Sequence, residues 1–535
     1  MLNAADGASA TPTVQPGGVT PQLLIVTVDS VQAAIALIAP TEGEARFIAS
    51  RSAIVDEPHR GIPGALTQLA TDGGFALAAE MIGATIIAGP PIAVRVVGEC
   101  TAADAAALAI AERFGIARMV AVPMTPPRNP TRDHAWYRPV IDACRDGRIE
   151  ALLVVVSPGV LPLWAAQFLT ALSEVVTGEQ ALVLLLASDA DLADMVSVDA
   201  IFLPRDTHQT SHLTGTLNRL RAARLLCGNI ADAPILARPE ALALAIQSVR
   251  AACGRSCVYL DVADGTTIIV TDENGMAVHH DPAIDYARGA ARLLNHCEPA
   301  QIIRWIPLAV SASALRTWAL RRISEPMAIL TDEEDRVIAA GFARAALAMA
   351  LEKIALPILD GAMWILGPAL ARLGSHAAAL RLVADLMPSA RVAIVTCDDD
   401  DLIPAVGALS VSHPPEASSL LAHDALVPAG SVVQASSSGK RARGVMTATL
   451  ASDTRTVTIE VTPDTLTAVP CLTSATFSLT GDALRGDRIS VQGGPGGVLV
   501  DMRRRPLAAV TPHASRPSVS GRLRPAAAPN GTSDI

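Results

Sequence analysis

Short apolar runs alternate with Ala-rich helical runs over most of the first 430 residues. ATIIAG (84–89), IAVRVVGE (92–99) and ALLVVVS (151–157) have strand length, and TAADAAALAIAERFG (101–115) has helical spacing. Strands that alternate with helices predict βαβ units and a substantially parallel sheet. Further along, TDEED (331–335) is predicted to begin a long helix that ends near residue 355, because acidic side chains stabilise a helix N-terminus.

The pattern changes beyond residue 443. GVMTATLASDTRTVTIEVTP (444–463), RISVQGG (488–494) and GVLVDMRR (497–504) alternate Thr or other polar residues with apolar ones, and short turns separate them. This alternation predicts antiparallel strands with one face in water. Residues 1–20 and 512–535 are small, polar and rich in Pro, without periodicity, so we expect both to be disordered tails.

One uncharged segment is long enough to cross a bilayer. Ala151–Leu172 has no charged residue, but Ser157-Pro158-Gly159 and Pro162 interrupt it after a β-branched run. A buried strand, a turn and a helix therefore fit better than a membrane span, and the first twenty residues lack the pattern of a signal peptide. We expect a protein with no membrane segment.

Composition narrows the classes of function. With 535 residues, two to four domains are expected, and 3% aromatic residues imply cores of Ala, Leu, Val and Ile. The net charge of −10 argues against binding to nucleic acid. Among eight scattered cysteines the one close pair is Cys253 and Cys257, with no second pair to complete a zinc site. We therefore expect no metal site and a reducing, cytoplasmic location.

The stretch VYLDVADGTTIIVTDENG (258–275) carries the main candidate chemistry. It predicts a strand, a turn, a second strand and a closing Asn-Gly turn. A carboxylate at a strand end can hold hydrated Mg²⁺, Gly lets backbone approach a phosphate, and Thr supplies donors. Those residue types are Asp261, Gly265, Thr266 and Thr267. An ordinary core strand with a polar turn explains the same residues, and both interpretations stay open at this point.

Six other stretches, together with this hairpin, give a resemblance in chain order. They are LLIVTVDSVQAAIAL (23–37), IIRWIPLAVSASALRTW (302–318), GFARAALAMALEK (341–353), WILGPALARLG (364–374), VAIVTCDDDDLIPAVGAL (392–409) and GGPGGVLVDMRRRPL (493–507). Together with DVADGTTII (261–269) they resemble the GlmL/MutL family, the accessory proteins of cobalamin-dependent glutamate mutase. No single motif is strong, but their order along residues 22–511 matches that of the family.

The resemblance implies a fold, a cofactor and a partner. The fold is the ASKHA fold shared by actin, Hsp70 and sugar kinases, an α/β architecture in which two related lobes clasp ATP. It divides this chain into an N-terminal lobe at 21–252, a C-terminal lobe at 253–425 and a C-terminal β-rich region at 426–511. The cofactor of the family is ATP with Mg²⁺, and the partner it implies is a cobalamin-dependent mutase.

Departures from the family pattern fall on its nucleotide-binding elements. Thr27, Asp29, Val31 or Ala33, and Ala34 stand where the first phosphate loop has Asp, Gly, Thr and a basic residue. In the second loop Ala263 replaces Gly and Ile268 replaces the final acidic residue. The adenosine loop, GSGG in the family, is Gly367-Pro368-Ala369-Leu370 here, and Pro removes an N–H donor.

These changes favour a degenerate ATPase that acts as a binding scaffold. We assign no catalytic residue and treat Asp261, Gly265, Thr266, Thr267 and Gly367 as a vestigial nucleotide site. Two alternatives stay open: an active ATPase with an unusual phosphate loop that assists cobalamin exchange, and a small-molecule binder that reuses the cleft.

Two charged runs complete the candidates. Arg503, Arg504 and Arg505 follow a Gly-rich turn and suit an anion site, although solvated arginines beside a tight turn explain them equally well. The four carboxylates of 398–401 suggest a metal cluster, but Pro404 just after them favours a helix N-terminus.

Overall fold

The computed structural model describes about three fifths of the chain, in segments. These are residues 22–28, 32–41, 44–54, 82–88, 92–98, 105, 108, 117–119, 137–145, 151–156, 163–175, 182–187, 200–204, 217, 235–263, 265–282, 284–287, 289–325, 330–354, 359–387, 392–434, 446–452, 456–462, 464–480, 488–503 and 523–525. The tail expected at 1–20 lies outside them, as does that expected at 512–535, apart from a short strand at 523–525.

The first sheet has five strands in the order β10-β4-β1-β2-β3. They are β1 (Gln22–Val28), β2 (Gln32–Thr41), β3 (Glu44–Ile54), β4 (Ile82–Ala88) and β10 (Ile235–Ala237). β1, β2 and β3 form an antiparallel meander, whereas β4 runs parallel to β1 and β10 runs parallel to β4. Apolar side chains of this sheet, such as those of Ile25 and Val26, are buried.

A second sheet begins with the same arrangement. Its first five strands follow the order β13-β12-β11-β14-β15. They are β11 (Cys257–Asp261), β12 (Thr266–Asp272), β13 (Gly275–Asp281), β14 (Ala362–Leu366) and β15 (Val392–Cys397). Again the first three strands are antiparallel, and the last two run parallel to β11.

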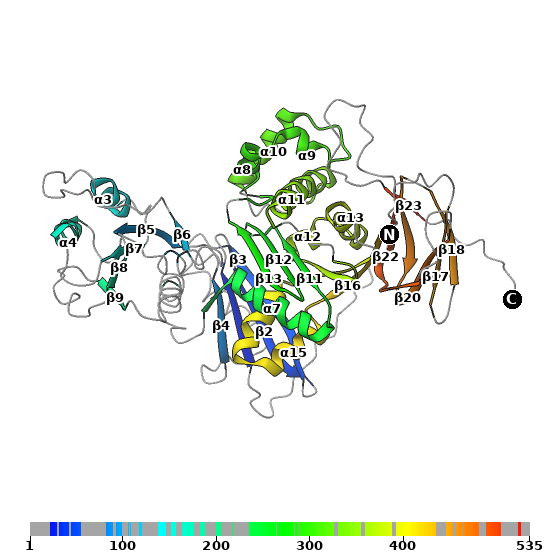
Figure 1. Cartoon of the computed structure of the whole chain (residues 1–535), viewed down its shortest axis with the longest axis horizontal. Coiled ribbons are helices and arrows are strands. Elements are labelled where there is room, and N and C mark those ends of the chain that lie inside the picture. The colour runs from blue at the N-terminus through cyan, green and yellow to red at the C-terminus, as the bar shows by residue number, and fades with distance from the viewer. Residues whose placement is uncertain are drawn as a thin grey trace, which may run out of the picture.

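The repeated strand order identifies two related units. In each unit an antiparallel three-stranded meander is followed by two parallel strands added on the other side of its first strand. Figure 1 shows these two sheets side by side in the middle of the molecule. A two-lobed α/β fold of the ASKHA type, as the resemblance implies, is therefore the fold of this chain. The exact limits of the lobes stay a prediction.

A separate parallel sheet is inserted in the first unit, between β4 and β10. Its order is β6-β5-β7-β8-β9, and all of its pairings are parallel. The strands are β5 (Ile92–Gly98), β6 (Ala117–Met119), β7 (Ala151–Val155), β8 (Leu182–Ala187) and β9 (Ala200–Pro204). Helices α3 (Arg138–Arg145) and α4 (Leu163–Val175) pack on it.

The strand and the helix expected within 151–172 are thus confirmed, and the turn expected between them lies outside the described residues. Among the described residues, no helix is both long and apolar enough to cross a membrane.

Four helices are described in the second unit between β13 and β14. They are α8 (Ala290–His296), α9 (Pro299–Ile303), α10 (Ala312–Ser324) and α11 (Glu333–Ile354). In Figure 1 they lie above the second sheet, with α11 nearest to it. The long helix predicted from 331 to about 355 is therefore confirmed, with three acidic residues in its first turn.

The remaining described elements after Val427 are strands. The second sheet grows to nine strands through β16 (Val427–Gln434), β19 (Leu466–Cys471), β22 (Gly494–Asp501) and β23 (Leu523–Pro525). A four-stranded antiparallel sheet is formed by β17 (Met446–Ala451), β18 (Thr456–Val461), β20 (Ala475–Thr480) and β21 (Arg488–Val491). The C-terminal β-rich region is therefore present, and its strand β16 pairs directly with β15 of the second lobe.

Three helices connect the two lobes. They are α7 (Arg238–Cys253), α14 (Ile403–Ser412) and α15 (Pro414–His423). One hydrophobic cluster combines their buried residues with Leu23 and Ile25 of the first sheet and Tyr259 and Ile365 of the second. α7 and α14 approach so closely that a Cβ atom on Gly407 would lie 1.7 Å from the carbonyl oxygen of Ala241. The lobes therefore share a packed interior.

Candidate functional site

The candidate site forms where β11, β14 and the first turn of α7 meet. Asp261 is the last residue of β11 and is 2% exposed. Its Oδ2 accepts a hydrogen bond from the guanidinium of Arg238 at 3.1 Å. Its Oδ1 accepts from the backbone N–H groups of Val262 at 2.8 Å and Ala263 at 3.2 Å. Both carboxylate oxygens are therefore engaged within the protein.

Arg238 joins three parts of the chain. It directly follows β10, the last strand of the first sheet, and it is the first residue of α7. Besides Asp261, its guanidinium donates to both oxygens of Asp401, at 2.7 Å and 2.9 Å. Two parallel N–H···O bonds to one carboxylate are the strongest geometry that Arg offers. Arg238 therefore links the first lobe to the C-terminal end of β11 and to the turn before α14.

The acidic run 398–401 lies directly before the N-terminus of α14, as the sequence predicts. Asp398 is fully buried and accepts hydrogen bonds from the backbone N–H groups of Leu402 at 2.7 Å and Ile403 at 3.1 Å. These are two of the N–H groups that the first turn of a helix leaves without an intrahelical partner. Within the segments described, no three His, Cys, Asp or Glu side chains gather in a way that could hold a metal ion.

Gly367 lies against Asp261. It follows β14 and precedes α12 (Pro368–Arg372), and its N–H donates to the carbonyl of Leu260 at 2.8 Å. A Cβ atom at this position would lie 2.7 Å from Cγ of Asp261 and 2.8 Å from the hydroxyl of Tyr259. Side chains of two β11 residues, Asp261 and Tyr259, therefore occupy the space beside Gly367.

Burial dominates the electrostatics of this cluster. It raises the pKa of Asp261, although the positive charge of Arg238 opposes the shift. Burial also raises the pKa of Asp398 well above its ordinary value, and the negative charge of Asp401 adds to this. For Arg238 burial lowers the pKa, but Asp401 and Asp261 outweigh it and leave the pKa well above the ordinary value. The guanidinium is therefore the fixed positive charge around which three carboxyl groups gather.

Tyr259 differs from the charged residues of this cluster in its hydrogen bonding. Burial raises the pKa of its phenol well above the ordinary value, and the charge of Asp261 adds to the shift. Its hydroxyl is buried and has no hydrogen-bond partner among the described residues. The phenol therefore stays neutral and serves as a wall of the site.

The two threonines of the second loop use their hydroxyls inside the protein. Thr266 donates to the carbonyl of Ile284 at 2.6 Å, and the hydroxyl of Thr267 is 2.9 Å from Nδ1 of His280. Gly265 has a φ of +84°, and a Cβ atom there would lie 2.6 Å from the carbonyl oxygen of Asp281. Thr267 pairs with Asp261 across β11 and β12, so these residues are neighbours, as the sequence predicts.

The candidate anion site is only partly described. Arg503 is buried, and its guanidinium donates to Asp501 at 2.9 Å and 3.0 Å and to Asp385 at 2.7 Å. Burial lowers the pKa of Arg503, but these two carboxylates reverse the effect and raise it. Arg504 and Arg505 lie outside the described residues, as does Asp29 of the first phosphate loop. The anion site stays a prediction.

Sequence reasoning missed Arg238 and Tyr259, and it treated Asp401 only as part of the acidic run before a helix. Arg238 precedes a Pro at the start of a helix, which is a common surface position and indicates no site. Asp401 has a φ of +60°, and its ion pair joins residues 163 positions apart. No local pattern reports such a pairing.

Comparison with known proteins gives structural likeness without a sequence family. No family model matches the chain, and no curated protein sequence matches it. A Ppx/GppA family protein from Aquifex aeolicus aligns at 8% identity with a TM-score of 0.21, covering 64% of this chain and 66% of the other. The chain therefore spans just under two thirds of the length of that protein.

Two sugar-kinase structures align over more of their length. A carbohydrate kinase from Novosphingobium aromaticivorans aligns at 12% identity with a TM-score of 0.27, covering 74% of this chain and 92% of the other. The putative N-acetylglucosamine kinase of Porphyromonas gingivalis aligns at 8% identity with a TM-score of 0.26, covering 73% and 99%. These proteins are members of the ASKHA superfamily. The two-lobed fold itself is established here by the repeated strand order.

Proposed function

We propose that this chain is an ASKHA-fold protein that does not hydrolyse ATP and acts by binding a partner protein. The single observation that carries the proposal is the ion pair of Arg238 with Asp261, at 3.1 Å. Asp261 has the place that the resemblance gives to a residue of the phosphate and magnesium site. Here that carboxylate is buried, bonded to an arginine and covered by Gly367.

The ion pair between Arg238 and Asp261 disfavours the binding of Mg²⁺ for two reasons. Mg²⁺ needs oxygen ligands and keeps several waters, so a carboxylate that holds it must face an open, hydrated cleft. A Mg²⁺ ion that approached Asp261 would also meet the positive charge of Arg238. To displace the arginine would leave a buried charge without its partner, which costs about 3–5 kcal/mol in comparable pairs. This supports a site that is closed to Mg-ATP.

Other links between the lobes support a static scaffold. The carboxylate of Asp424, just after α15, accepts three hydrogen bonds from Arg46 of β3, at 2.7–3.2 Å. Ser419 of α15 donates to the carbonyl of Ala45 at 3.0 Å. With Arg238 these contacts tie the first sheet to helices of the second lobe. A protein held in this way has no need of a nucleotide to set the position of its lobes.

The partner we propose is a cobalamin-dependent mutase of the glutamate mutase class. The ordered resemblance of residues 22–511 to the GlmL/MutL family supports this choice, and the repeated lobes are consistent with it. In this proposal the chain binds the mutase as a scaffold, and ATP hydrolysis drives neither assembly nor release.

A binding measurement with purified components tests the proposal. A cobalamin-dependent glutamate mutase, with intact or inactivated cofactor, is immobilised and titrated with the chain in the presence and absence of Mg-ATP. The expected result is a saturable complex whose dissociation constant is the same with and without the nucleotide. A complex that forms or dissociates only while ATP is hydrolysed would contradict the nonhydrolytic part. Absence of any complex with both forms of the mutase would remove this partner class.

A further inference from the structure

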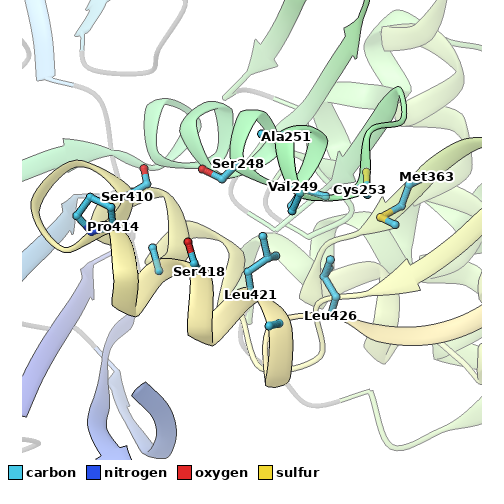
Figure 2. Close-up of a pocket in the computed structure, with 13 residues that line it drawn as sticks. Ser248, Val249, Ala251, Cys253, Met363, Ser410, Pro414, Ser418, Leu421 and Leu426 are labelled. Atoms are coloured by element: carbon cyan, nitrogen blue, oxygen red, sulfur yellow. The ribbon is translucent and has the colours of Figure 1, made fainter. Parts of the chain in front are cut away.

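A pocket of about 530 Å³ opens at the far end of α7, away from Arg238. The last turns of α7 form one wall, and α15 with the end of α14 forms the opposite wall (Figure 2). Most of the lining is apolar, including Val249, Leu421 and Leu426. Two sulfur-bearing side chains, Cys253 and Met363, lie together at one end.

A third sulfur atom, that of Cys257, lies close to Cys253. Sγ of Cys253, the last residue of α7, is 3.9 Å from Sγ of Cys257, the first residue of β11. Cys257 and Met363 are partners in the parallel pairing of β11 with β14, so their side chains lie on the same face of the sheet. Cys257, Cys253 and Met363 belong to one packed cluster. The fold thus gathers two thiols and a thioether in one cluster, and Cys253 and Met363 of this cluster line the pocket.

The separation of 3.9 Å between the two thiol sulfur atoms is compatible with a shared metal ion. Two sulfur ligands about 2.3 Å from a metal, at roughly 120° to each other, lie about 4.0 Å apart. A disulfide needs about 2.05 Å, close to half of the distance found here. Met363, which lies near Cys253 in the pocket lining, would supply the third sulfur of such a trigonal arrangement.

We propose that Cys253, Cys257 and Met363 bind a Cu(I) ion in a three-sulfur site that opens on this pocket. Thiolate and thioether ligands are soft and select Cu(I) over harder cations. Binding releases the two thiol protons to solvent, and the two thiolates with one Cu⁺ give the site a net charge of −1. Both thiols now point at the carbonyl oxygen of Arg255, at 3.8 Å from Cys253 and 3.5 Å from Cys257. Binding of Cu(I) requires both thiols to turn away from this carbonyl.

The residue that follows Cys253 explains why the two cysteines lie close together. Gly254, between the cysteines, ends α7 with a φ of +64° in the left-handed region, and its N–H donates to the carbonyl of Arg250. This turn brings the last residue of the helix beside the first residue of the strand that follows. Other free cysteines, such as Cys297 in a separate cluster of the second lobe, lie away from this group. Cys297 instead directs its thiol at the carbonyl of Leu293 at 3.2 Å.

Competition for Cu(I) under anaerobic conditions tests the proposal. The full-length reduced chain is titrated into the complex of Cu(I) with a coloured chelator, and loss of colour reports transfer. One Cu(I) per chain is expected. Cys253→Ser should lower the affinity by at least the 10–100-fold that loss of an outer partner costs at metal sites. Met363→Leu conserves the side-chain volume, so it keeps the fold and isolates the thioether.

X-ray absorption at the copper edge provides the second readout. The wild-type chain should give a shell of three sulfur atoms, and Met363→Leu should give a shell of two. Cys297→Ser is the matched control and should behave as the wild type in both measurements. The proposal is overturned if the chelator keeps all of the copper, or if Cys253→Ser and Met363→Leu bind it as tightly as the wild type.

Discussion

The guanidinium of Arg238 lies 3.1 Å from the carboxylate of Asp261, although one residue follows the first sheet and the other ends a strand of the second. Side-chain exposures of 10% and 2% make this a buried ion pair. Asp401, with a side chain 28% exposed, extends it toward solvent. A position that the resemblance assigns to phosphate and magnesium is thus used to join the two lobes.

Removal of Arg238 should destabilise the protein strongly. In Arg238→Met the carboxylate of Asp261 stays buried without its partner, and the free energy of unfolding should fall by about 3–5 kcal/mol. Adding Asp261→Asn to this variant removes the uncompensated charge and should recover part of the loss. Urea unfolding of the two single variants and the double variant gives the coupling between the residues.

The matched control for this cycle is Arg336→Met. Arg336 pairs with Glu333 on the surface of α11, with side-chain exposures of 40% and 76%. Such a pair contributes about 0–1 kcal/mol. Equal losses in Arg238→Met and Arg336→Met would mean that the pair at Asp261 does not hold the lobes together.

Gly367→Ala tests whether the expected nucleotide position is filled by the protein itself. The new Cβ atom would lie 2.7 Å from Cγ of Asp261, so β14 or β11 must shift, and we expect a loss of about 1–3 kcal/mol in the free energy of unfolding. Tyr259→Phe in the same chain removes the hydroxyl that would lie 2.8 Å away and should restore part of the loss. Thermal and urea unfolding measure both effects. An unchanged stability in Gly367→Ala would show that the space is open.

The contact between Arg46 and Asp424 should make stability depend on pH. Hydrogen bonds from Arg46 lower the pKa of Asp424. A carboxyl with a lowered folded pKa contributes stability above its unfolded pKa, about 3.9, and loses it as the pH falls through the folded value. Asp424→Asn should therefore lower the free energy of unfolding by about 1–2 kcal/mol at neutral pH, since Arg46 is partly exposed. The difference from the wild type should shrink as the pH falls from 5 toward 3.

Glu44→Gln provides the matched control on the same surface. Glu44 and His423 connect β3 and α15 at 2.8 Å, but their side chains are 57% and 39% exposed. We expect this change to cost less than about 1 kcal/mol. A pH-independent difference between Asp424→Asn and the wild type would contradict the assigned role of the Asp424 carboxylate.

Local patterns were enough to predict most of the elements around the site. The apolar run before Asp261 and the Asn274-Gly275 turn predicted the hairpin of β11, β12 and β13, because strand burial and turn chemistry depend on neighbours in sequence. For the same reason, the acidic residues at the start of α11 indicated where that helix begins, and Pro404 indicated where α14 begins. These predictions are confirmed by the described residues.

The closure of the site could not be predicted in this way. The Arg238–Asp401 contact spans 163 residues, and the approach of Gly367 to Tyr259 depends on how β11 and β14 pair in the sheet. The departures at Ala263 and Leu370 indicated a changed site, but they did not indicate what fills it. Such long-range contacts depend on tertiary packing, which a single sequence does not report.

Calorimetric titration of the full-length chain with Mg-ATP tests the central claim most directly. With Asp261 held by Arg238 and covered by Gly367, we predict no saturable heat up to about 1 mM nucleotide, a binding free energy weaker than about −4 kcal/mol. A micromolar dissociation constant that Asp261→Ala weakens would contradict this account.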